Sequence, residues 1–294
     1  MKRGMSRDPL GDHLRHLQVR NLRPTTIASR RAHIYRLAAA LRVAPDDTLL
    51  AVTRTDLERW QEGLSRHSPN HRKTATSHTR AFYGWAVVAD LIDRNPAVTL
   101  AAVRVPATLP RPIGEDDLDF AIACAPDRLR AMLVLAAYQG LRACEIATLH
   151  REDVHDHADP PVLFVTGKGG KQRVVPLSER AILELRAHGL PVRGYVFGRF
   201  DGGPGGNTPA RVSKLCNRYL HGMGITDQMH SLRHRFGTAA YGVSRDLRVT
   251  QELMGHSSPQ TTAGYVAWSH AAAVSAVNGI RGATLHGSQV LPVT

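Results

Sequence analysis

Apolar residues recur every three to four positions through the first hundred residues of the chain. The segment that begins at Pro24 places Ile34, Leu37 and Leu41 on one side, with polar residues at most positions between them. This spacing is typical of an amphipathic α-helix. Similar patterns predict three more helices, a short one that Leu14, Leu17 and Val19 start, one that begins at Thr55 and contains Leu64, and one over about 70–91. Four such helices predict a compact bundle.

The fourth of these helices carries the bulkiest apolar side chains. Phe82, Trp85, Val88 and Leu91 follow core spacing along it. Aromatic side chains at such positions are more often packed in a core than used to stack on nucleic-acid bases. We therefore expect this face of the helix to be buried in the bundle.

Three prolines then interrupt the pattern, at Pro106, Pro110 and Pro112. A proline-rich stretch without a periodic apolar pattern is typical of an extended linker. We expect an N-terminal helical domain over residues 1–101, a linker over 102–112 and a second domain over 113–294.

The second domain is expected to combine helices with one β-hairpin. Strand-like runs at 161–166 and 172–177 flank a loop of three glycines and two lysines, which predicts the hairpin. Helical patterns cover most of the remaining chain, at about 116–123, 127–138, 142–149, 178–188, 209–221, 230–240, 246–254 and 271–279. The predicted fold class is therefore mainly α with a small β-sheet.

The stretch from His230 to Tyr265 gathers chemically reactive side chains. His230 and Arg233 are three residues apart, so a helix places them on one face. Gly255 is expected to end the next helix in the left-handed conformation. A Ser-Pro pair then predicts another helix start, which leaves His256 in a joint and the tyrosine about two turns further on. Imidazoles, a guanidinium and a phenol near helix ends are typical of a phosphate site with a nucleophile.

The charge of the chain favours a polyanionic partner. The net charge is +13 and the pI about 10.4, with basic residues spread through the sequence. Nucleic acid is the commonest polyanion for such a surface, and solubility alone is the alternative. No apolar run approaches the roughly 20 residues of a membrane span, and the N-terminus resembles no secretory signal. Three separated cysteines predict free thiols in a cytoplasmic protein.

Two basic motifs precede the reactive stretch. Gly140 interrupts a helical pattern and puts Arg142 at a helix N-terminus, where its guanidinium can reach a phosphate, although such an arginine is often a solvated cap. The hairpin loop carries Lys168 and Lys171 but lacks the glycine and hydroxyl positions of a P-loop. Its lysines therefore contact a nucleic-acid backbone or form a solvated turn.

Together these motifs resemble the tyrosine recombinase family, also called phage integrases. Gly-Leu-Arg, Gly-Lys-Gly, His-x-Leu-Arg-His, Leu-x-Gly-His and a tyrosine nine residues on occur in family order. The resemblance implies a SAM-like core-binding helical bundle followed by an α+β catalytic domain. The catalytic set it implies is Arg142, Lys168, His230, Arg233, His256 and Tyr265. Glu145 is expected either to support this set or only to cap a helix and pair with an arginine.

The chemistry of this set fits DNA strand transfer. Tyr265 would attack a backbone phosphate and hold it as a 3′-phosphotyrosine, so that the bond energy is kept and no ATP, metal or other cofactor is needed. The two arginines would clamp the charged oxygens, His230 would take the proton of the phenol, Lys168 would protonate the departing 5′ oxygen and His256 would donate a further hydrogen bond. The sequence departs from the family pattern at Gln139, Arg235 and Met254, and none of these departures replaces a reacting group.

The resemblance also implies partners. It implies double-stranded DNA with core-type sites and a tetramer on two sites, and the family allows an accessory directionality factor. Only about eight residues precede the first helix, so we expect no module for arm-type sites. The apolar segment 271–279 is expected to dock on a neighbouring protomer. The candidate DNA contacts are Arg30, Arg31, Arg72, Lys73, Arg80, Lys171 and Arg173.

Three functions remain open at this point. The leading one is a site-specific DNA recombinase that integrates or excises a mobile element or resolves replicons. The alternatives are a type IB-like topoisomerase and a DNA-binding regulator without catalysis. His155 and His157 have no carboxylate or cysteine at ligand spacing, so we expect solvated histidines and no metal site.

Overall fold

The computed structural model describes residues 8–106, 110–167 and 170–255. The chain packs as two compact units, Met1–Ala107 and Thr108–Thr294. The division between them lies inside the stretch 102–112 that the prolines mark as a linker.

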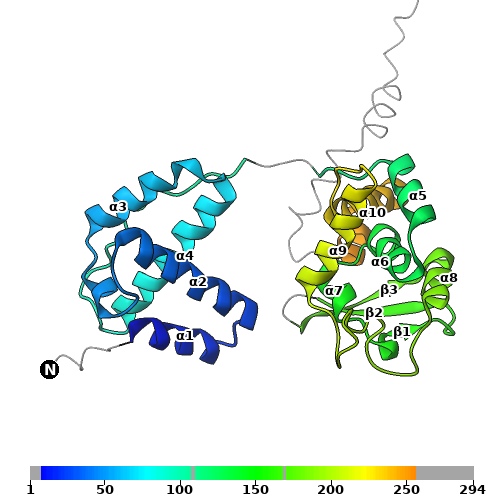
Figure 1. Ribbon diagram of the computed structural model, residues 1–294, viewed down its shortest axis with the longest axis horizontal. Coiled ribbons are helices and arrows are strands. Elements are labelled where there is room, and N and C mark those ends of the chain that lie inside the picture. The colour runs from blue at the N-terminus through cyan, green and yellow to red at the C-terminus, as the bar shows by residue number, and fades with distance from the viewer. Residues whose placement is uncertain (1–7, 107–109, 168–169, 256–294) are drawn as a thin grey trace, which may run out of the picture. The chain divides into compact units, whose positions relative to one another are not determined.

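The first unit is a bundle of four α-helices, coloured blue to cyan in Figure 1. They are α1 (Pro9–Val19), α2 (Pro24–Leu41), α3 (Arg54–Gly63) and α4 (Pro69–Val88), with short 3-10 turns at Asp47–Ala51 and Leu64–Arg66. Side chains before three of the helices accept backbone N–H groups of the first turn: Asp8, Thr53 and Ser68. Such caps satisfy donors that have no partner within the helix, which fixes where each helix begins.

The core of this unit lies between α2, α3 and α4. Ile34, Leu57, Phe82 and Tyr83 are fully buried, and the Tyr83 hydroxyl donates a 2.9 Å hydrogen bond to the Leu49 carbonyl. The predicted core role of Phe82 is therefore confirmed.

The predicted burial of Val88 is wrong, because this residue is 80% exposed. It is the last residue of α4, whose buried residues end at Ala86. Residues 89–101 are not helical, and two of them, Ala97 and Leu100, complete the core in its place.

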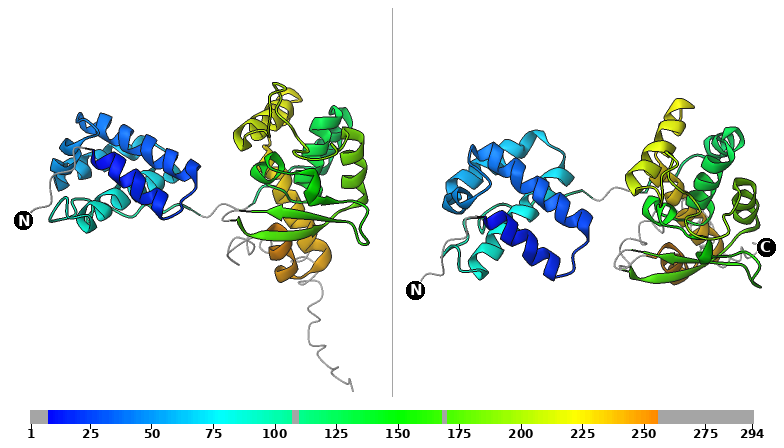
Figure 2. Two further views of the ribbon diagram at one scale, coloured as in Figure 1. Left: turned by 90° about the horizontal axis from the view of Figure 1, so that it is seen from below. Right: turned by 60° about the horizontal axis from the view of Figure 1, so that its bottom comes forward.

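The second unit contains seven α-helices and a three-stranded antiparallel sheet within its described residues (Figures 1 and 2). The helices are α5 (Glu115–Cys124), α6 (Asp127–Tyr138), α7 (Ala143–Ala147), α8 (Glu179–His188), α9 (Pro209–Gly222), α10 (Met229–Ser244) and α11 (Leu247–Met254). The strands are β1 (Val154–His155), β2 (Val162–Thr166) and β3 (Gln172–Pro176), in the order β1-β2-β3. The predicted class, mainly helical with a small sheet, is confirmed.

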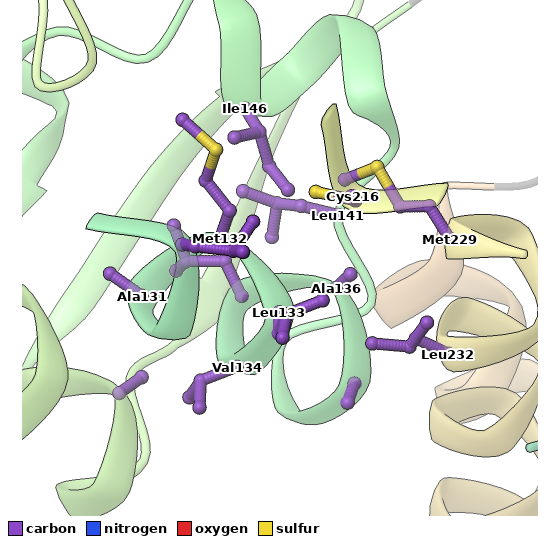
Figure 3. Packing of buried hydrophobic residues seen from close by; sticks show 14 of the residues in the cluster. Ala131, Met132, Leu133, Val134, Ala136, Leu141, Ile146, Cys216, Met229 and Leu232 are labelled. Carbon is purple, nitrogen blue, oxygen red and sulfur yellow. The ribbon is translucent and has the colours of Figure 1, made fainter. Parts of the chain in front are cut away.

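Helix α6 forms the centre of the second core. Its residues from Ala131 to Ala137 are all buried, and α8 and α10 pack against it. Figure 3 shows its apolar side chains meeting Ile146 of α7, Cys216 of α9 and Leu232 of α10. Helices α7, α8, α9 and α10 thus all pack against α6.

The hairpin alternates between an inner and an outer face. Leu163 pairs with Val175 and Val165 pairs with Arg173, and the three apolar members of these pairs are buried. Phe164 pairs with Val174, and both side chains point to the outer face and are exposed. Because side chains of a strand alternate in direction, this register turns Arg173 toward the interior.

Candidate active site

The joint between α6 and α7 places the first arginine. Gly140 has φ +64°, and a Cβ added there would lie 2.3 Å from the ring of Phe236. Only glycine combines this left-handed backbone with such a close approach. The turn makes Arg142 the N-cap residue of α7, with its side chain 30% exposed.

The carboxylate of Glu145 lies at the centre of the site, and its side chain is fully buried. Arg142 donates to it twice, from the backbone N–H at 2.8 Å and from Nη1 at 2.8 Å. Arg173 forms a bidentate pair with it at 2.9 and 3.0 Å. Nη1 of Arg233 lies 3.8 Å from Oε2. Glu145 therefore both caps α7 and brings together three guanidinium groups from three parts of the sequence.

These cations determine the charge of Glu145. Burial alone raises the pKa of a carboxyl group. Here the hydrogen bonds and charges of Arg173, the backbone N–H of Arg142 and the charge of Arg233 outweigh burial and lower the pKa of Glu145 to about 2. The residue is consequently ionised at neutral pH and offsets part of the positive charge of the arginines.

Arg233 extends from α10 into the interior and is 2% exposed. It donates to the carbonyls of Gly140 and Met254. Arg142 Nη2 donates to the next carbonyl of the chain, that of Gly255, at 3.3 Å. The two arginines that the family pattern indicates, 91 positions apart in sequence, thus meet at the C-terminus of α11.

His230 lies one helical turn before Arg233, in the first turn of α10. Its ring packs edge-on against that of His234 at 4.4 Å. Desolvation of the ring, followed by the charges of Arg233 and Arg142, lowers the pKa of His230 below its usual value. For the same reasons of burial and neighbouring positive charge, the pKa of His234 falls to about 4. Both imidazoles are neutral at pH 7 and can accept a proton.

The rest of the predicted catalytic set lies outside the described residues: Lys168, His256 and Tyr265. The residues that directly precede Lys168 and His256 do border the site. A Cβ on Gly167 would lie 3.7 Å from Oε1 of Glu145, and one on Gly255 would lie 2.9 Å from Nη1 of Arg173. The chain positions before Lys168 and before His256 thus border the same carboxylate and its partners.

The comparison with known families decides the assignment. A family model, the phage integrase family, matches residues 115–271, more than half of the chain. The chain belongs to the phage integrase family. It is a tyrosine-type site-specific recombinase, as its relatives are. Tyrosine recombinase XerC of Myxococcus xanthus is 32% identical over 244 residues, covering 75% of this chain and 80% of the relative. XerC of Chromobacterium violaceum is 31% identical over 277 residues, covering 86% and 88%.

Solved structures of integrases and Xer recombinases share the fold. XerA recombinase is 23% identical, covers 94% of this chain and 98% of its own, and has a TM-score of 0.51. A lambda integrase (75–356) dimer bound to a COC′ core site is 19% identical, with coverages of 87% and 93% and a TM-score of 0.67.

The predicted DNA contacts of this recombinase occupy different environments. Arg31, Lys73 and Lys171 are exposed and Arg72 is partly exposed. Arg30 is partly buried, and Arg80 donates to the carbonyl of Leu100, so each has part of its side chain inside the first unit. Arg173 is only 11% exposed, and its donors contact Glu145 and the Leu253 carbonyl. These contacts argue against a phosphate contact for Arg173.

A basic face of α9 was missed by the sequence interpretation. Arg211, Lys214, Arg218 and His221 are all exposed. The opposite face of the helix is buried through Val212, Cys216 and Leu220. The basic residues recur every three to four positions, so the same period that predicted the helix could have revealed a cationic stripe.

In the part of the chain that the structure describes, no group of three or more histidine, cysteine, aspartate or glutamate side chains is arranged to hold a metal ion. Within the same ranges, no helix is both long and apolar enough to cross a membrane.

Proposed function

We propose that this recombinase cuts and rejoins duplex DNA through a covalent link between Tyr265 and a 3′ phosphate. The observation that carries the proposal is the convergence of Arg142 and Arg233 on one buried carboxylate, with a neutral His230 one turn away. Two guanidiniums held rigidly at one point suit the non-bridging oxygens of a phosphodiester, because charge grows there during attack.

In this reaction the phenol oxygen of Tyr265 forms a bond to phosphorus, and the bond to the 5′ oxygen breaks. His230 accepts the phenol proton, which the lowered pKa of this histidine permits at neutral pH. Lys168 donates a proton to the departing 5′ oxygen, and His256 donates a hydrogen bond to the phosphate. A 5′ hydroxyl from another strand then attacks the phosphotyrosine and reverses the same steps.

DNA binding is supported by charge. The chain carries +13, and α9 presents a basic stripe of four exposed residues. The lambda integrase chain with the same fold was solved as a dimer bound to a COC′ core site and as a tetramer bound to a Holliday junction. We propose that the present chain likewise recognises core-type sites and assembles as a tetramer on two of them, in the cytoplasm.

The test is a nicked DNA substrate that carries the attachment site read from DNA flanking the gene. Cleavage next to a nick releases a short strand and traps the covalent adduct. We expect an adduct with the wild type and with the control Tyr241→Phe on α10, and none with Tyr265→Phe. No adduct with the wild type on its cognate site refutes the proposal. Relaxation of supercoiled plasmid without recombinants would assign a topoisomerase.

A further inference from the structure

The guanidinium of Arg173 lies where the β2–β3 hairpin meets α7 and α11. Its Nη1 and Nη2 donate to the two oxygens of Glu145 at 2.9 and 3.0 Å. Its Nε donates to the carbonyl of Leu253 at 3.0 Å. Each nitrogen of the group is thus used inside the protein, and the side chain is 11% exposed.

Arg173 completes a set of three arginines that all contact Glu145 and the C-terminal end of α11. Every member contacts Glu145. Each also donates to one of three consecutive carbonyls at the end of α11: Arg173 to Leu253, Arg233 to Met254 and Arg142 to Gly255. The last carbonyls of a helix lack partners within the helix and form the negative end of its dipole. Three cations therefore link a carboxylate on one side to a helix end on the other.

Two of these arginines are the proposed phosphate ligands, but the third belongs to the hairpin. Arg173 on β3 pairs in register with Val165 on β2, two residues before the chain reaches Gly167. Gly167 in turn borders Glu145, as its added Cβ would lie 3.7 Å from Oε1. The base of the hairpin, which precedes Lys168 in sequence, is therefore tied to the carboxylate that holds the phosphate ligands.

We infer that Arg173 is a positioning residue of the strand-transfer reaction. It fixes Glu145 so that Arg142 and Arg233 present their guanidiniums together. It also ties the start of the loop bearing Lys168 to the end of the helix that leads to His256. This inference rests on the proposed function, since it assigns Arg173 a role in placing those reacting groups.

Loss of Arg173 should change the pKa of Glu145 and the rate of cleavage. Glu145 would lose a bidentate pair and the first of the interactions that lower its pKa, while its burial, which raises the pKa, would remain. Among the residues that the structure describes, the charged groups that would still contact Glu145 are Arg142 on α7 and Arg233 on α10. Misplacement of reacting groups by about 1 Å can lower a rate on the order of 100-fold. We expect single-turnover cleavage by Arg173→Met at saturating protein to fall about 10- to 100-fold.

The matched control is Arg248→Gln. Arg248 lies on α11, is 73% exposed and pairs only with the exposed Glu252 among the described residues, so this variant removes one positive charge without a buried contact. We expect it to cleave as the wild type does. Lys171→Met, on the exposed part of the same hairpin, serves as the contrast for a DNA contact and should weaken binding.

The experiment measures DNA affinity and cleavage of the nicked substrate by the full chain across pH. We expect Arg173→Met to bind DNA within about twofold of Arg248→Gln, and its cleavage to fall at higher pH than that of the wild type as the solution is acidified. Arg173→Lys, which keeps the charge but not the bidentate geometry, should be intermediate.

Two outcomes overturn the inference. One is cleavage by Arg173→Met at the rate and with the pH profile of Arg248→Gln. The other is a loss confined to affinity, as for Lys171→Met, which would assign a DNA contact. If Arg173→Met does not fold, the rate and pH profile of Arg173→Lys decide, and a wild-type profile in that variant refutes the inference. Absence of a Tyr265 adduct in the wild type would instead refute the proposed function.

Discussion

Replacing Glu145 by glutamine tests the electrostatic centre of the site. The amide has nearly the shape of the carboxylate, but it removes the negative charge and turns an N–H₂ group toward guanidiniums. The pKa of Glu145 is lowered from its ordinary value of 4.5 to about 2. At about 1.4 kcal/mol per pKa unit, this difference corresponds to about 3 kcal/mol of folding free energy. Removing one partner of a buried ion pair costs a similar amount, roughly 3–5 kcal/mol.

The sign of the pH dependence follows from the lowered pKa. The contribution of Glu145 is fully present above its unfolded-state value of 4.5 and is lost as the pH falls toward 2. We therefore expect Glu145→Gln to be less stable than the wild type by about 3 kcal/mol at neutral pH. The difference should shrink below pH 4.5 and close near pH 2.

The assay must report on the second unit. Two of the three tryptophans, Trp60 and Trp85, belong to the first unit and Trp268 belongs to the second, so tryptophan fluorescence would mix the transitions of both units. Hydrogen exchange of peptides from α6, α7 and α10, measured in increasing denaturant, follows the unit that contains Glu145. Glu252→Gln is the control, because that carboxylate is 61% exposed and its pair with Arg248 should contribute less than about 1 kcal/mol. Equal stability of Glu145→Gln and the wild type at neutral pH would refute the reasoning.

Three further predictions concern single positions. Gly140→Ala should destabilise the second unit by about 2–4 kcal/mol in denaturant unfolding, because Gly140 has a positive φ and the ring of Phe236 lies close to it. Gly222 has open space around it, so the control Gly222→Ala should change stability by about 0.5 kcal/mol or less. His230→Gln should lower single-turnover cleavage on the order of 100-fold; in the wild type the rate should fall on acidification with its midpoint below the ordinary pKa of 6.5, and a midpoint above that value would contradict the lowered pKa. Lys214→Met should weaken DNA binding and reduce its salt slope by about 1, and an unchanged slope would remove the α9 stripe from the DNA interface.

The helices could be predicted because their signals are local. Helix α2 begins at the expected Pro24 and includes the expected Leu41, and α6 covers the expected 127–138. A proline in the first turn, a glycine after the last and a period of 3.6 residues act within a few residues of each other. Strand β1 was missed because two residues are too few for any period.

Contacts between distant segments could not be predicted in the same way. Arg173 resembled a surface cation in a basic loop, yet its partners lie 28 and 80 residues away in sequence. One signal was present, because Arg173 is two residues from the apolar Val175 and so shares its face of the strand. The family pattern indicated Arg142 and Arg233, and the structure brings both to Glu145, but the pattern says nothing of the carbonyls they bind. The roles of Lys168, His256 and Tyr265 stay predictions.

The arginine set at Glu145 restricts how a heat-resistant version of this enzyme can be engineered. Exchanging a buried ion cluster for apolar side chains is often neutral or favourable for stability. Here such an exchange would remove the groups assigned to hold the phosphate, because the same guanidiniums also brace α11. Gains in heat resistance must instead come from places that take no part in this cluster. The surface-exposed Val19 and Val192, at 87% and 95% exposure, offer such places for polar replacement.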